Sequence, residues 1–146
     1  MDLTLERALT IARTTLEEGT RRGFAPLCAV VLDSGGRVLV VLRDHNASIG
    51  RPEIATAKAA GCLAMGFGGR ELARRAQNMP GFFAGLVHVL PNGLLPVPGG
   101  VLIRSDDGRL IGAVGVSGDT SDNDEICAVA SILAAGLVAD TGDAVP

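Results

Sequence analysis

The sequence predicts an α+β domain in which helices pack against an antiparallel sheet. Apolar runs of strand length occur in pairs around short polar turns, as expected for β-hairpins. Segments with helical spacing of apolar residues surround these pairs, and the sequence has no GxGxxG fingerprint of a nucleotide-binding sheet. With 146 residues, no internal repeat and no long linker, the chain is expected to form a single domain over residues 1–146.

The sequence of the first half of the chain predicts a helix followed by a β-hairpin. The N-terminal segment is expected to be an amphipathic helix because apolar residues recur at helical spacing, at Leu5, Leu9, Ala12 and Leu16. Residues 27–32 form a continuous apolar run typical of a central strand that is covered on both faces. The turn residues 33–36 and the apolar run 38–42 complete the hairpin.

The middle of the chain predicts two helices and an irregular connection. Pro52 suits the first position of a helix that extends to about Gly66, and Glu53 lies in its first turn, where the helix dipole favours an acid. A short helix is expected over residues 69–78. The stretch 80–100 is rich in proline, so it is expected to be an irregular connection with a short edge strand.

A second hairpin and a closing helix are predicted for the last third. The strands are expected at 101–104 and 110–117, around the turn residues 105–108. The closing helix is expected from Ser121 to about Asp140. Its apolar stripe consists of Ile126, Val129, Leu133 and Leu137.

Charge and cysteine content exclude several classes of function. A formal net charge of −3 argues against nucleic-acid binding, because no basic patch is available to displace counterions from phosphates. No apolar run approaches the roughly 20 residues that cross a bilayer, and the N-terminus lacks the apolar centre of a signal peptide. The three cysteines are far apart and odd in number, which favours a reducing compartment. We therefore expect a cytoplasmic protein that contacts neither nucleic acid nor membrane.

Lys58, the only lysine, is the first candidate functional residue. It falls on the apolar side of its predicted helix, between Ile54 and Cys62, where an ammonium needs a partner, a route to solvent or a pocket. One interpretation is structural, with Lys58 in a salt bridge to a carboxylate of another element. The other is functional, with Lys58 as an anion anchor or as a lysine activated for base or Schiff-base chemistry.

The segment 115–125 is the second candidate. A strand passes through a glycine turn at Gly118 into a helix N-terminus, where free backbone N–H groups can donate hydrogen bonds to an acceptor atom of a ligand. The acids Asp122, Asp124 and Glu125 fit an ordinary capped helix, or they pair with Lys58 or an arginine, or they accept a substrate proton. The helical phase predicts that Asp122 points nearest to the apolar stripe.

Two histidines complete the candidates. His45 follows a strand in the segment Arg43-Asp44-His45-Asn46-Ala47, a position where loop residues often contact ligands. His88 lies in an apolar stretch and is expected to be structural. No HExxH motif or Cys/His cluster is present, so a dedicated zinc site is not expected.

These pieces together resemble the GlcG/HbpS haem-binding family, which includes the C-terminal domain of PduO-type proteins. The match covers nearly the whole chain in order. Its landmarks are the leucine-rich opening helix, VVLDSGG at 30–36, the strand exit at 43–47, EIATAKAA at 53–60, the glycines 99 and 100, IGAVGVSG at 111–118 and the acids 124 and 125.

The resemblance implies a five-stranded antiparallel sheet flanked by helices, with a profilin-like outline, in a homo-oligomer. It also implies a ligand pocket near the Lys58 helix and the loop before the last helix. The chain departs from the family pattern in two places. His45 and Asn46 stand where the family usually has an acidic residue and a glycine, and the chain proceeds to Val101 and Leu102 where the family usually has a proline after the double glycine.

Two functions follow as hypotheses. In the first, the domain binds haem or a related tetrapyrrole. His45 or Cys28 would then ligate the metal, and the ligand-binding residues would be Arg43, His45, Glu53, Lys58, Gly118 and Glu125. In the second, the domain is a small isomerase or lyase that acts on a carboxylated or carbonyl metabolite. Its catalytic residues would be Lys58, His45, Asp122 and Asp124.

Overall fold

The computed structural model describes residues 2–143, which form five helices and one five-stranded sheet. The elements in chain order are α1 (Leu5–Arg22), β1 (Cys28–Asp33), β2 (Val38–Arg43), α2 (Arg51–Met65), α3 (Gly69–Asn78), α4 (Pro80–Leu86), β3 (Gly100–Arg104), β4 (Leu110–Ser117), α5 (Ser121–Ala134) and β5 (Val138–Asp140). No helix in this part of the chain is long and apolar enough to cross a membrane.

The sheet has the strand order β2-β1-β4-β3-β5, and each neighbouring pair is antiparallel. The predicted α+β class, the two hairpins and the five-stranded antiparallel sheet are therefore confirmed. The central strands β1 and β4 are buried along nearly their whole length. This burial agrees with their continuous apolar sequences, because a strand that is covered on both faces needs no polar alternation.

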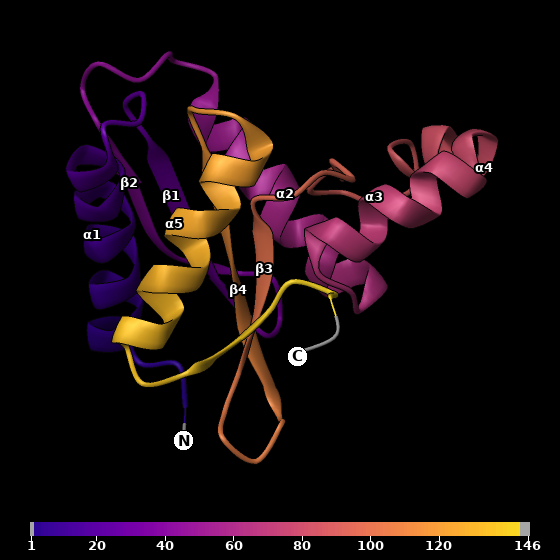
Figure 1. The fold of residues 1–146 in the computed structure, drawn as a ribbon. Helices are drawn as coiled ribbons and strands as arrows, with labels where there is room; N and C mark the ends of the chain where they lie inside the picture. Colours follow the sequence, from indigo (N-terminus) through magenta and orange to yellow (C-terminus); the bar gives the residue numbers. More distant parts are fainter. Residues whose placement is uncertain (1, 144–146) are drawn as a thin grey trace.

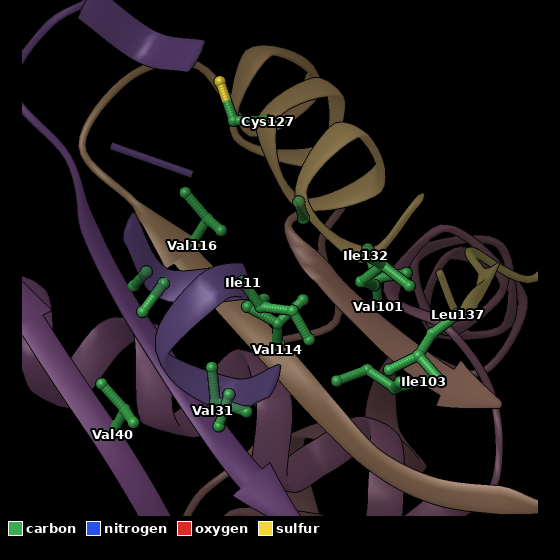
Figure 2. Close-up of a cluster of buried hydrophobic side chains, with 14 of the residues drawn as sticks. Ile11, Val31, Val40, Val101, Ile103, Val114, Val116, Cys127, Ile132 and Leu137 are labelled. Atoms are coloured by element: carbon green, nitrogen blue, oxygen red, sulfur yellow. The ribbon is translucent and has the colours of Figure 1, made fainter. Parts of the chain in front are cut away.

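Helices cover both faces of the sheet (Figure 1). Helices α1 and α5 pack side by side on one face, where Figure 2 shows Ile11 and Ile132 pointing toward Val101 and Val114 of the sheet. Helix α2 covers the other face, mainly over β4 and β1. Helix α4 lies beyond α3, away from the sheet (Figure 1).

Two predictions about secondary structure were wrong. Residues 80–86 form helix α4 instead of part of an irregular connection with an edge strand, because Pro80 begins a helical turn as readily as it interrupts a strand. The closing helix ends at Ala134, well before Asp140, and the edge strand is β5. Gly136 adopts a φ of 75°, which turns the chain out of the helix and lets Leu137 pack into the core.

Glycines allow α2 to lie unusually close to the sheet. A Cβ added at Gly115 of β4 would overlap the carbonyl of Ala55, and one added at Gly100 of β3 would overlap the carbonyl of Lys58. The small residues Ala55 and Ala59 of α2 face the same strands. The backbone of α2 therefore nearly touches β3 and β4, which fixes the position of the side chain of Lys58.

We predict that Gly115→Ala lowers the free energy of unfolding by about 2 kcal/mol or more, because the added methyl group must displace helix backbone. Gly81→Ala is the matched control. Its Cβ would meet open space in helix α4, so the change should be neutral or stabilising by up to about 1 kcal/mol. Urea unfolding followed by circular dichroism measures both, and equal effects of the two variants would contradict the close packing.

Candidate functional site

Most of the predicted site residues lie at one end of the sheet. Cys28 of β1 is paired in register with Arg43 of β2 on one side and with Ser117 of β4 on the other. The loop from β2 to α2, which carries His45, leaves the sheet at this end, and α5 begins there (Figure 1). The strand exits thus bring together segments that are more than 60 residues apart in the sequence, as the 66 residues between Lys58 and Asp124 illustrate.

Lys58 and Asp124 form a buried ion pair at this end. The Nζ of Lys58 lies 2.9 Å from Oδ2 of Asp124 and donates a second hydrogen bond of 2.9 Å to the carbonyl of Val116. The two side chains are 5% and 1% exposed. Because this pair links α2, the end of β4 and the start of α5, it fixes the junction of three elements.

Residues near Lys58 and Asp124 explain why the two side chains can meet. Gly99, with a φ of 112°, has no side chain to occupy the space beside the ammonium of Lys58, where a Cβ would lie 2.9 Å from Nζ. The other carboxylate oxygen of Asp124 accepts a 3.0 Å hydrogen bond from the backbone N–H of Asp119. Burial raises the pKa of the Asp124 carboxyl, and the ammonium of Lys58 opposes this rise.

Lys58 therefore forms a salt bridge with a carboxylate of the last helix, which is one of the alternatives that the sequence left open. The prediction that Asp122 points nearest to the apolar stripe was wrong. The Asp122 side chain is 74% exposed and bonds to Arg70 at 2.8 Å, whereas Asp124 is the buried acid. The predicted stripe was itself wrong: Ile126 and Leu133 are 40% and 60% exposed, so Asp122, which lies on the same side of α5 as Ile126, is exposed as well.

Arg70 was not identified from the sequence. It lies at the start of α3 and binds Glu125 through two nitrogens at 2.8 to 3.1 Å, in addition to its bond to Asp122. This arrangement ties α3 to the first turn of α5. Glu125, a predicted ligand-binding residue, is thereby occupied by a guanidinium, and no local sequence pattern signals a contact across 55 residues.

Asp119 was also missed, although its place between Gly118 and the helix is typical of a capping acid. Its carboxylate accepts bonds from the backbone N–H of Ala25 at 2.7 Å and of Thr120 at 2.8 Å, and from the side chain of Asn123 at 2.7 Å. These bonds hold the pKa of Asp119 below its usual range. The residue thus fastens the segment before β1 to the start of α5.

Gly118, a predicted ligand-binding position, has a structural reason to be glycine. Its φ is 149°, and an added Cβ would overlap the carbonyl of Pro26. The turn between β4 and α5 is therefore packed against the segment that precedes β1. Helix α5 begins after Thr120, whose side-chain oxygen accepts a hydrogen bond from the backbone N–H of Asn123.

His45 stands at the surface on a loop that is held by many hydrogen bonds. Its side chain is 88% exposed, and its Nδ1 lies 3.7 Å from the carboxylate of Asp44. One nitrogen of the Arg43 side chain donates to the carbonyls of Asp44, His45 and Ala47, the last at 2.7 Å. The backbone around the imidazole is therefore fixed, while the ring itself faces solvent.

The remaining candidates lie apart from the imidazole or beneath the surface. Cys28 is completely buried, and burial raises the pKa of its thiol to about 11, so the thiol is protonated at neutral pH. Glu53 is exposed at the start of α2 and lines a cavity of about 280 Å³ with Thr56 and Asn92. His88 follows α4 and is exposed, which contradicts its expected structural role.

Within residues 2–143, no group of three or more His, Cys, Asp or Glu side chains is arranged to hold a metal ion. Two cavities lie near the ends of the His45 loop. One of about 210 Å³ is lined by Asp44, Asn46 and Leu27, and the other is the cavity that contains Glu53, in the first turn of α2. The site therefore offers an exposed imidazole, the guanidinium of Arg43 and these two hollows.

The overall architecture is shared with several solved structures. A double mutant of Streptomyces reticuli HbpS is 29% identical with a TM-score of 0.79, over 92% of this chain and 87% of that chain. A PduOC–haem complex is 26% identical with a TM-score of 0.81, over 98% and 100%. Klebsiella pneumoniae protein ORFY is 25% identical with a TM-score of 0.81, over 91% and 90%.

The family model described as "Haem degrading protein HbpS-like" matches residues 3–133. The chain therefore belongs to the HbpS-like family, as the resemblance in its sequence indicated. A search of curated protein sequences finds no significant match.

We predict that Lys58→Met lowers the free energy of unfolding by about 3 kcal/mol, because it leaves the buried carboxylate of Asp124 without its counter-charge. Combining it with Asp124→Asn should recover part of the loss. Arg21→Met, which removes a surface ion pair with Glu18, is the control and should change stability by less than about 1 kcal/mol. Urea unfolding is the measurement, and a Lys58→Met variant as stable as the control would refute the assignment.

We also predict that Asp119 contributes to acid sensitivity. Its pKa is lowered in the folded chain, so its stabilising effect is complete above the pKa of the unfolded state and is lost as the pH falls below about 4. The Asp119→Asn variant should be less stable than the wild type at pH 7, and its stability should fall less steeply below pH 4. Unfolding midpoints measured from pH 7 to pH 3 test this, and parallel curves for both proteins would contradict it.

Proposed function

We propose that this domain binds haem or a related tetrapyrrole beside the β2–α2 loop, with the imidazole of His45 as the axial ligand. The observation that carries the proposal is the exposed His45 ring on a loop whose backbone is fixed by Arg43. A neutral imidazole is a common protein ligand of haem iron. Membership of a family described as haem-degrading, and the likeness to a PduOC–haem complex, support the choice of ligand.

The side chains around His45 fit such a group. Ile49, on the same loop, is 88% exposed, and Val41 of the preceding strand is 44% exposed. These apolar surfaces suit contact with the macrocycle, which is largely apolar. The Nε and Nη2 groups of Arg43 have no acceptor among residues 2–143, so they remain available for a propionate.

The hollows beside the loop are shallow for a ligand of this size. Their volumes of about 210 and 280 Å³ fall below the roughly 300 Å³ at which enclosed ligand pockets begin. We therefore propose that a second copy of the chain completes the site in a homo-oligomer. Glu53, which lines one of the hollows, would lie at the edge of this shared site.

Lys58, Gly118 and Glu125 act indirectly in this proposal. Lys58 is bound to Asp124, Glu125 is bound to Arg70, and Gly118 shapes the turn between them. These residues hold the end of the sheet from which the His45 loop departs. The bound group supplies iron redox chemistry, and the chain positions it through an imidazole and a guanidinium.

The geometry favours a binding protein over an isomerase or lyase. The four candidate catalytic residues do not surround one cavity. Lys58 and Asp124 are buried against each other, Asp122 bonds to Arg70 at the surface, and His45 lies on a separate loop. Turnover of a small metabolite through Lys58 would require the ion pair to open.

We predict that hemin titration gives a saturable, shifted Soret band and that His45→Ala weakens binding at least tenfold, because it removes the axial ligand. The matched control is His88→Ala, which removes the other exposed histidine and should leave the titration unchanged. Light scattering on the same samples should give a mass that is a multiple of 14.9 kDa.

Two outcomes would contradict the proposal. A hemin titration without saturation would show that haem is not the ligand. An unchanged Soret band in His45→Ala would show that His45 does not bind the iron. A loss of binding in His88→Ala instead would move the iron ligand to His88, which follows α4. A monomeric mass in the presence of bound hemin would overturn the shared site.

A further inference from the structure

A second, larger cavity lies on the other side of the molecule from α1, between α3 and the last strand. Its volume is about 560 Å³, and it is lined by Phe67, Glu71, Arg75, Arg104, Asp140 and Asp143 together with two glycines. It shares no lining residue with the two hollows beside His45. The proposed haem site does not account for the charged groups gathered here.

The three carboxylates that line this cavity are all engaged by arginines. The Glu71 carboxylate already accepts three bonds from Arg74 and Arg75. Asp140 accepts bonds from Arg104 and from the backbone N–H of Gly142, and Asp143 accepts one from Arg74. Each of the three carboxylates in the lining is therefore already hydrogen-bonded to an arginine side chain.

The two arginines that line the cavity keep donors to spare. Arg75 bonds only through Nε, so both of its terminal nitrogens lack an acceptor within residues 2–143. Arg104 bonds through Nε to Asp140 and through Nη1 to the carbonyl of Gly108, which leaves its Nη2 without a partner in the same range. A guanidinium presents five N–H donors and no acceptor, so the spare nitrogens of Arg75 and Arg104 can bind an anion.

The cavity is also held in shape before any ligand arrives. The guanidinium of Arg75 lies over the ring of Phe67, with its carbon 3.9 Å from the ring centroid, and this contact fixes its orientation. The C-terminal segment is packed tightly on the start of α3, where a Cβ at Gly68 would overlap Thr141. Arg70 further fastens this junction by donating its backbone N–H to the carbonyl of Thr141.

We propose that this cavity is a second ligand site, which takes a small organic anion with at least two carboxylates. One carboxylate binds the terminal nitrogens of Arg75, another binds Arg104, and the carbon skeleton lies near Phe67. Fixed guanidinium groups suit carboxylates because two parallel N–H groups meet two oxygens. This inference does not depend on the haem proposal, since the two sites have no residue in common.

The test is calorimetric titration of the full chain with citrate at constant ionic strength. We expect saturable binding, and we expect acetate, with a single carboxylate, to bind at least tenfold more weakly. Arg75→Gln should weaken citrate binding at least tenfold, because a hydrogen bond to a charged group is lost. Arg75 is half-exposed and is not itself part of the buried core, so the variant should fold, as circular dichroism will verify.

A matched control and a second variant complete the design. Arg21→Gln removes one positive charge from α1, on the opposite side of the molecule (Figure 1), and should bind citrate within twofold of the wild type. Arg104→Lys keeps the charge that pairs with Asp140 but removes the guanidinium fork, and should weaken binding. Three results would each overturn the proposal. The first is a citrate titration without saturable heat, and the second is equal citrate binding by Arg75→Gln and Arg21→Gln. The third is binding of free arginine, a cation, in place of citrate.

Discussion

The buried ion pair between Lys58 and Asp124 is the constraint on which the rest of the structure depends. The ammonium leaves α2 on one face of the sheet and reaches the first turn of α5, which covers the other face. This crossing is possible only because Gly99, Gly100 and Gly115 let α2 lie against the ends of β3 and β4. Since each charge would be costly to bury alone, the two helices must keep their relative positions.

The fold was largely predictable from local sequence, because its hairpins and its first two helices have strong local signals. Apolar runs on either side of the turns at 33–36 and 105–108 predict the hairpins. The errors occur where one residue decides between two outcomes. Pro80 begins a helix although prolines also mark irregular segments, and Gly136 ends α5 although the apolar spacing continues to Leu137.

The site was predictable only in part, because its chemistry depends on contacts between distant segments. The sequence indicated that Lys58 would need an acid of the last helix, and the structure supplies Asp124. The apolar spacing favoured Asp122 over Asp124 as the inward-pointing acid, and this was wrong because the apolar residues Ile126 and Leu133 on that side of α5 are exposed. The partners of Glu125 and Asp119 lie 55 and 94 residues away, and no local pattern indicates them.

The proposed ligand-binding roles belong to exposed side chains that a rigid sheet and its helices hold in place. The sheet and its helices position the loop of His45 at one end of the sheet, and they position Arg75 and Arg104 beside β5. None of these three side chains belongs to the buried core.

Amide hydrogen exchange of the wild-type protein tests the central claim most directly. The N–H of Asp119, which bonds to the paired carboxylate, and the N–H of Val116, which bonds to Gly99, belong to the junction. If the ion pair locks that junction, both amides should exchange only through global unfolding, as slowly as the amides of β1. Exchange of these two amides as fast as that of the exposed loop around His45 would contradict the account.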